Sequence, residues 1–177
     1  MDDALEHLNE LSREELTAEL LKCCGSTRWA REVSLERPFS NRQELIDTAE
    51  RVWWSVGRED WLEAFRSHPK IGEKKAARET GDRARRWSEE EQTGANAAAS
   101  DVLDALAAAN REYEQRFGFI FIVCATGKSA GQMLALLQER FGNDPETEIR
   151  VAAGEQLRIT QLRLEKLLES WKAEVET

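Results

Sequence analysis

The stretch Pro145–Lys172, PETEIRVAAGEQLRITQLRLEKLLESWK, decides the fold class because its apolar residues recur with the period of an α-helix. When successive residues are turned by about 100°, one face collects these side chains: Ile149, Ala153, Thr160, Leu164, Leu167 and Trp171. A helix with one continuous apolar face buries that face against other elements. The stretch therefore predicts a long helix with a core-facing side.

The same period recurs along most of the chain. Helices are predicted within residues 2–24, 41–56, 58–67, 88–117 and 129–141. Ser12 with Glu15 is a possible capping box that starts a second short helix in the first segment, and Ser40 or Asn41 can cap the helix at 41–56. No linker or repeat divides the chain, so we expect residues 1–177 to form a single compact all-α domain of roughly seven to nine helices.

One run, Phe117–Ala125, has the composition of a β-strand. An apolar run this short can equally be a buried helical segment or a buried irregular one. The sequence leaves these alternatives open.

Composition narrows the range of functions. The formal net charge of the 177 residues is −9, which argues against a nucleic-acid or anionic-membrane surface because both need a positive footprint. The N-terminal residues Met1–Glu6 are acidic and do not resemble a secretory signal, and no apolar run approaches membrane-spanning length. We therefore expect a cytoplasmic protein with no nucleic-acid or membrane partner.

The cysteines do not suggest a disulfide framework, because there are three of them and Cys23 and Cys24 are adjacent. The chain has two histidines and neither Cys-x-x-Cys nor His-x-x-x-His spacing, so no metal site is expected. Cys124 lies in the apolar run, where a buried inert thiol is the default.

His68 is the first candidate for chemistry. Trp61, Phe65 and His68 fall at i, i+4 and i+7 on one helix face, and Pro69 ends that helix because proline disfavours helical dihedrals in the residue before it. Gly72 lets the chain turn further, so the imidazole can face a cleft and exchange a proton near neutral pH. The alternative is a histidine that packs in the core or caps the helix.

Ser88–Gln92 is the second candidate. Ser88 with Glu91 three residues later has the pattern of a capping box, which is a structural role. The same helix start would also present N–H donors to an anionic ligand, with Gln92 able both to donate and to accept.

Arg163 is the third candidate. It projects, with Gln156, onto the border of the apolar face of the C-terminal helix, whereas Arg158 points nearly opposite. Its guanidinium can extend to solvent along that border, or it can bind a carboxylate through a forked pair of hydrogen bonds.

A phosphate-binding loop at Ala125–Ser129 is not expected. The segment follows an apolar run and contains Gly127, Lys128 and Ser129, but the required glycine five positions before the lysine is replaced by Val123. A turn at Gly127 into a helix capped by Ser129 explains the pattern better.

Together, these motifs resemble the 2-oxo-4-hydroxy-4-carboxy-5-ureidoimidazoline (OHCU) decarboxylase family of urate degradation. The resemblance covers residues 7–170 and rests on these motifs in register: Arg37-Pro38-Phe39, His68 to Gly72, Ser88 to Gln92, Phe117 to Phe119 with Phe121 to Ala125, and Leu162-Arg163-Leu164. The run Ile120–Ser129 looks like the bacterial branch of the family.

The resemblance implies an all-α and usually homodimeric enzyme, a carboxy-lyase that turns OHCU into (S)-allantoin and carbon dioxide without a cofactor or metal. It implies His68 as the catalytic residue and favours a catalytic or ring-binding role for Glu91. The substrate-binding residues that it implies are Pro69, Ser88, Glu89, Glu90, Gln92, Phe121, Ile122, Val123, Cys124, Ala125 and Arg163.

Two rival interpretations remain. A non-enzymatic helical adaptor would use tryptophan-rich helix faces, such as those with Trp53, Trp54 and Trp61, to bind a partner. Alternatively, the same pocket would act on another ureido or hydantoin acid. The adaptor hypothesis predicts that the candidate site residues lie far apart or exposed, whereas the enzyme hypothesis predicts that they converge on one pocket.

Overall fold

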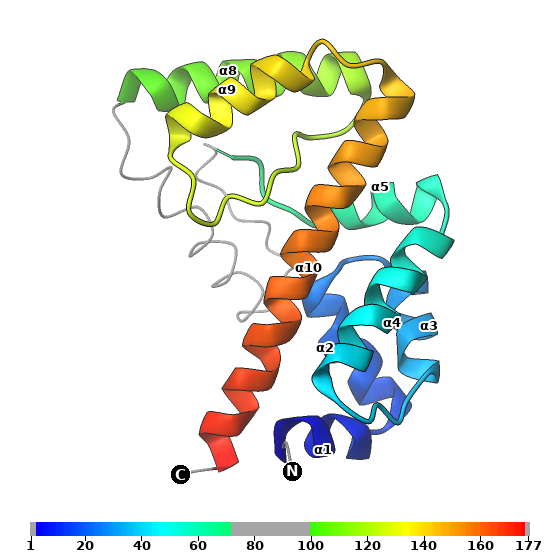
Figure 1. Ribbon diagram of the computed structural model, residues 1–177. Helices are drawn as coiled ribbons and strands as arrows, with labels where there is room; N and C mark the ends of the chain where they lie inside the picture. The colour runs from blue at the N-terminus through cyan, green and yellow to red at the C-terminus, as the bar shows by residue number, and fades with distance from the viewer. Residues whose placement is uncertain (1–2, 72–99, 176–177) are drawn as a thin grey trace. The chain divides into compact units, whose positions relative to one another are not determined.

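The computed structural model describes residues 3–71 and 100–175, and it confirms the all-α prediction (Figure 1). These residues contain eight helices and no strand. The helices are α1 (Asp3–Glu10), α2 (Arg13–Cys23), α3 (Thr27–Leu35), α4 (Arg42–Ser55), α5 (Arg58–Arg66), α8 (Ser100–Phe117), α9 (Ala130–Arg140) and α10 (Pro145–Val175). None of the described helices combines the length and the apolar character needed to cross a membrane.

The chain divides into two compact units, whose boundaries fall inside α5 and α10. The first unit contains residues 1–64 and 157–177, and the second contains residues 65–156. The face predicted on α10 is buried at each of its positions: Ile149, Ala153, Thr160, Leu164, Leu167 and Trp171.

The caps of the first unit follow the sequence closely. Ser12 and Glu15 form the expected capping box at the start of α2, with each side chain bonded to the other residue's backbone N–H. Of the two candidates for α4, Asn41 is the cap, and its side chain accepts a hydrogen bond from the backbone N–H of Glu44. Ser40 lies just before the cap, and its backbone N–H donates to the Glu44 carboxylate over 2.6 Å.

Helix α3 is an element that the sequence analysis did not predict. Ser26 caps it, and α3 packs against both α2 and α4. Trp29 is fully buried, and its indole N–H donates to the carbonyl oxygen of Ala49 over 2.9 Å. This buried tryptophan with a satisfied N–H ties α3 to α4.

The loop between α3 and α4 contains a cis peptide bond between Arg37 and Pro38. Phe39 follows Pro38, and the side chain of Asn9 in α1 makes two hydrogen bonds to its backbone. The Asn9 side chain donates to the carbonyl oxygen of Phe39 and accepts from the Phe39 N–H, each over 2.9 Å. Phe39 is buried, so this double hydrogen bond fixes the loop where an apolar side chain enters the core.

In the second unit, α8 and α9 lie side by side (Figure 1). The apolar run that follows α8 is neither a strand nor a helix but a buried irregular segment, which is one of the alternatives left open. Gly118 starts it with a φ of 79°, a left-handed conformation that favours glycine. Tyr113 meets the ring of Phe119 edge to face, Phe117 contacts the same ring at a tilt, and the centre of the Phe65 ring lies 5.4 Å from its centre.

The segment proposed as a turn into α9 is confirmed as one. Gly127 has a φ of 74°, and Ser129 caps α9 in a capping box with Gln132. The Lys128 ammonium donates to the carbonyl oxygen of Cys124 over 2.8 Å, so this lysine braces its own loop. All three cysteines are buried and none is in a disulfide; burial was predicted for Cys124 alone.

Candidate active site

His68 lies two residues beyond the end of α5 and is half-buried. Its backbone N–H donates to the carbonyl oxygen of Phe65 over 3.2 Å and closes the end of the helix, which agrees with a capping role for its backbone. Its ring has a separate partner: Nε2 lies 2.6 Å from Oε1 of Gln156, a residue of α10 with 0% exposure. The imidazole is therefore held by a buried amide from a distant part of the sequence.

The residues after His68 are fastened to α8. The Lys70 ammonium lies 2.7 Å from the Glu114 carboxylate, and the side-chain amide of Asn110 donates to the carbonyl oxygen of Ile71 over 3.3 Å. Ile71 is buried and Pro69 is half-buried. These contacts, with the fixed φ of proline, hold the backbone on the C-terminal side of His68.

The segment Phe121–Ala125, predicted to bind substrate, is buried, and its backbone is bonded to side chains from three places. The carbonyl oxygen of Ile122 accepts from Arg140 over 2.7 Å, and the N–H of Cys124 donates to the Glu155 carboxylate over 2.8 Å. Lys128 holds the carbonyl oxygen of Cys124. An irregular segment lacks the hydrogen bonds of a helix or sheet, and these side chains replace them.

Arg140 is itself held in a buried charged network. Its guanidinium donates to one oxygen of Glu148 over 2.8 Å from Nε and 2.6 Å from Nη2, and it lies 4.5 Å from the centre of the Phe121 ring. The Tyr113 hydroxyl donates to the same Glu148 oxygen. Burial, and then the hydrogen bond to Glu148, raise the pKa of Tyr113 far above its ordinary range. Tyr113 therefore remains a donor at physiological pH.

One turn of α10 connects the predicted histidine with the predicted binding segment. Glu155 bonds to the backbone of Cys124, and the next residue, Gln156, bonds to the ring of His68. The helical period predicts Gln156 on the border of the helix face without indicating a role for it, and it marks neither Glu155 nor Arg140. A buried amide on an apolar helix face was the available signal for Gln156; nothing local marks the other two residues.

Arg163 belongs to the first unit and is 4% exposed, so it does not extend to solvent. Its charge acts on Cys24. Burial raises the pKa of the Cys24 thiol to about 11, and hydrogen bonds with the Ser26 backbone and the Thr160 side chain, followed by the charge of Arg163, partly oppose this rise. The residues Ser88, Glu89, Glu90, Glu91 and Gln92 lie outside the described residues. For them, the roles implied by the resemblance stay predictions.

Two of the three tryptophans that the adaptor hypothesis needs are core residues. Trp53 and Trp61 are buried, and the indole N–H of Trp61 donates to the carbonyl oxygen of Trp53 over 3.0 Å. Trp54 is 42% exposed. The described part of these helices thus offers one exposed tryptophan instead of a tryptophan-rich face, which counts against an adaptor.

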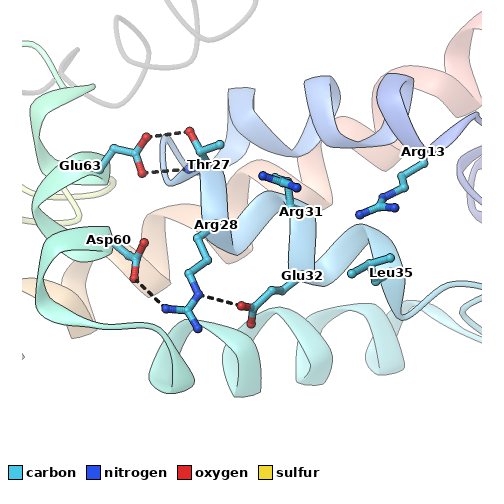
Figure 2. A pocket seen from close by; sticks show the side chains of 8 residues that line it. All are labelled: Arg13, Thr27, Arg28, Arg31, Glu32, Leu35, Asp60 and Glu63. Atoms are coloured by element: carbon cyan, nitrogen blue, oxygen red, sulfur yellow. Dashed lines mark hydrogen bonds and ion pairs between the residues drawn. The ribbon is translucent and has the colours of Figure 1, made fainter.

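A surface pocket of about 460 Å³ in the first unit is a different feature, and Figure 2 shows its lining. Arg28 lies 2.8 Å from Glu32 and 3.8 Å from Asp60, while the backbone N–H and hydroxyl of Thr27 both donate to Glu63. The charged groups of Arg28, Glu32, Asp60 and Glu63 are therefore engaged by other residues of the same pocket. The pocket contains none of the residues predicted for the site.

Comparison with known proteins shows which family the chain belongs to. The family model described as OHCU decarboxylase matches residues 9–165, most of the chain. The chain belongs to the OHCU decarboxylase family.

Individual relatives support this family assignment. The chain is 43% identical over 154 residues to the "Uric acid degradation bifunctional protein TTL" of Arabidopsis thaliana, covering 86% of this chain and 47% of that protein. It is 31% identical over 135 residues to the 2-oxo-4-hydroxy-4-carboxy-5-ureidoimidazoline decarboxylase of Amia calva, covering 75% of each. The chain thus spans less than half the length of the Arabidopsis protein. A bacterial branch is not borne out, since the Arabidopsis protein is from a plant.

A solved structure supports the fold. The chain superimposes with a TM-score of 0.74 on a crystal structure of OHCU decarboxylase in the presence of (S)-allantoin, at 40% sequence identity. The match covers 85% of this chain and 97% of that one. The described residues thus share the all-α fold of that protein.

Proposed function

We propose that this protein decarboxylates OHCU to (S)-allantoin and carbon dioxide in urate degradation, without a cofactor. The observation that carries the proposal is the contact between His68 and the buried Gln156, in a chain that belongs to the OHCU decarboxylase family. A histidine held at a helix end by a second element has the fixed position that controlled proton transfer requires.

The reaction breaks the bond between a ring carbon and the carboxylate carbon. Carbon dioxide departs, the bonding electron pair stays with the conjugated imidazoline ring, and a proton then adds to the ring carbon. Because the ring accepts the pair, the protein must supply orientation of the carboxylate, removal of water and a proton on one face. We assign His68 to the region of the departing carboxylate and to control of that proton.

The other roles follow the family resemblance. Glu91 and Gln92 bind ring or ureido N–H groups, with Glu91 also a candidate for a chemical role. Arg163 binds a carboxylate or carbonyl oxygen through its planar fork. The backbone of Phe121–Ala125 binds the hydantoin-like end, and the hydrogen bonds of Ile122 and Cys124 to side chains support this role by holding that backbone in place. The remaining residues of the site are Pro69, Ser88, Glu89 and Glu90.

We further propose that residues 1–177 act as one OHCU decarboxylase-like domain, as a homodimer in the cytoplasm. The family match supports the single domain because it runs from residue 9 to residue 165 and so includes residues of both units. The name of the Amia calva relative supports the substrate.

Activity is tested with OHCU freshly generated from urate, with product followed by circular dichroism so that (S)-allantoin is told from the racemate. We expect His68→Asn to lower kcat by about 100-fold or more, because a positioned acid or base contributes this much. His7→Asn is the matched control, since His7 is the other histidine and packs on Trp171 in the first unit.

Near-normal turnover by His68→Asn would sink the catalytic assignment. No turnover of OHCU by the wild type, together with turnover of another ureido or hydantoin acid, would leave the fold in place and change the substrate.

A further inference from the structure

We infer that Gln156 is a positioning residue for His68, holding the imidazole in the tautomer that carries its hydrogen on Nε2. The inference rests on the proposed function for its catalytic meaning, because there His68 controls the proton. Its structural content stands on one contact, the 2.6 Å approach between Nε2 of His68 and Oε1 of Gln156.

The chemistry of the two atoms sets the direction of this hydrogen bond. An amide oxygen accepts and cannot donate, so the hydrogen must lie on Nε2. In the opposite tautomer, the lone pairs of Nε2 and Oε1 would face each other at 2.6 Å. The bond therefore selects one neutral form of the ring and makes Nδ1 the nitrogen that gains and loses the proton.

The burial of Gln156 strengthens its preference for one tautomer of His68. Gln156 is fully buried, and Ala152 and Ala153, one turn earlier on α10, are fully buried as well. Because the amide is buried, water does not readily take the place of His68, so losing this hydrogen bond is costly. The adjacent Glu155 fixes the same turn of α10 by bonding to the backbone of Cys124.

A neutral amide also suits a group that must cycle between protonation states. Nε2 keeps its hydrogen in both the imidazole and the imidazolium form, so the bond to Gln156 survives when Nδ1 is protonated. A carboxylate at position 156 would also accept this hydrogen, but its charge would stabilise the imidazolium and oppose release of the proton. Gln156 thus orients the ring without trapping one charge state.

The tautomer can be read directly by long-range ¹H–¹⁵N correlation spectroscopy of protein labelled with ¹⁵N-histidine, at a pH where the rings are neutral. The chain has two histidines, so His7→Gln assigns both sets of signals. We expect the Nε2–H pattern for His68 in the wild type. Gln156→Leu, which has similar size and no acceptor, should move the ring to a mixture of tautomers.

Two variants serve as controls. Gln156→Glu keeps an acceptor and should restore the Nε2–H pattern, recorded at a pH high enough to neutralise the ring despite the added carboxylate. Thr160→Val removes another buried polar group from α10, one that bonds with Cys24, and should leave the His68 signals and turnover unchanged. In the assay with OHCU, we expect Gln156→Leu to lower kcat by about 100-fold with little change in KM, because misplacement affects the chemical step.

A wild-type His68 with its hydrogen on Nδ1 would overturn the inference, as would a Gln156→Leu protein with an unchanged tautomer and normal kcat. If Gln156→Leu does not fold, the wild-type and Gln156→Glu spectra still decide it. The spectra need no substrate, so a failure of the proposed function shows separately, as a wild type with the expected tautomer and no turnover of OHCU.

Discussion

The guanidinium of Arg140 donates a hydrogen bond to the carbonyl oxygen of Ile122 over 2.7 Å, and this bond ties the last residue of α9 to an irregular segment. The same guanidinium makes a charge-assisted pair with Glu148, which is fully buried. One side chain therefore joins a buried ion pair to the backbone of the proposed substrate site. The contribution of this side chain to the free energy of unfolding can be measured.

We predict that Arg140→Met destabilises the protein by about 3–5 kcal/mol, because it leaves the buried Glu148 charge without its partner. The free energy of unfolding from urea denaturation measures the effect. The double variant Arg140→Met with Glu148→Gln should recover part of the loss, since no buried charge is then unpaired. A double variant less stable than the single one would contradict this account.

We predict that Glu155→Ala lowers kcat/KM for OHCU about tenfold, because the N–H of Cys124 loses its acceptor and the binding segment loosens. Glu155→Gln keeps an acceptor oxygen and should fall between alanine and the wild type. Steady-state kinetics measure the change, while the unfolding midpoint shows whether folding is affected. Equal activity in all three proteins would show that this bond does not position the segment.

We predict that Arg163→Lys raises KM for OHCU about tenfold, because an ammonium cannot reproduce the planar, two-pronged hydrogen bonding of a guanidinium. The matched control is Arg158→Lys on the same helix, where the arginine is exposed and the change should have no effect on KM. Substrate-saturation curves for the two variants give the comparison. An unchanged KM in Arg163→Lys would remove this residue from the proposed site.

We predict that Cys24 makes the protein less stable at alkaline pH. Burial raises the pKa of its thiol to about 11, from an ordinary value of 9.0. As the pH rises above 9, the unfolded chain releases this proton before the folded one does, so the stabilisation present below pH 9 is lost by pH 11. Its magnitude is on the order of 2 kcal/mol.

Urea denaturation at pH 7.5 and at pH 10.5 tests this prediction. Cys24→Ala should lose less stability between the two pH values than the wild type, whatever its stability at pH 7.5. Parallel losses in the two proteins would show that the Cys24 thiol is not the group responsible.

Local sequence determined most of the described helices and several of their caps, because both depend on neighbouring residues. The period of apolar side chains located α10 with its buried face, and the caps at Ser12, Asn41 and Ser129 were visible as hydrogen-bonding residues just before apolar runs. Helix α3 escaped prediction, although its Ser26 cap and buried Trp29 are also local. In the structure, α3 packs against both α2 and α4, and these contacts are not local.

The candidate site also has features that the sequence indicated and features that only the structure showed. His68 could be singled out from residue type and spacing, whereas the resemblance of several motifs in order named the family and implied Pro69 and the run Phe121–Ala125 as substrate-binding residues. Only the tertiary structure decided that the run is irregular, because its conformation is fixed by side chains of Arg140 and Glu155 that lie elsewhere in the chain. It also decided that Gln156 is the partner of the His68 ring, since a contact across 88 residues of sequence exists only after the chain has folded.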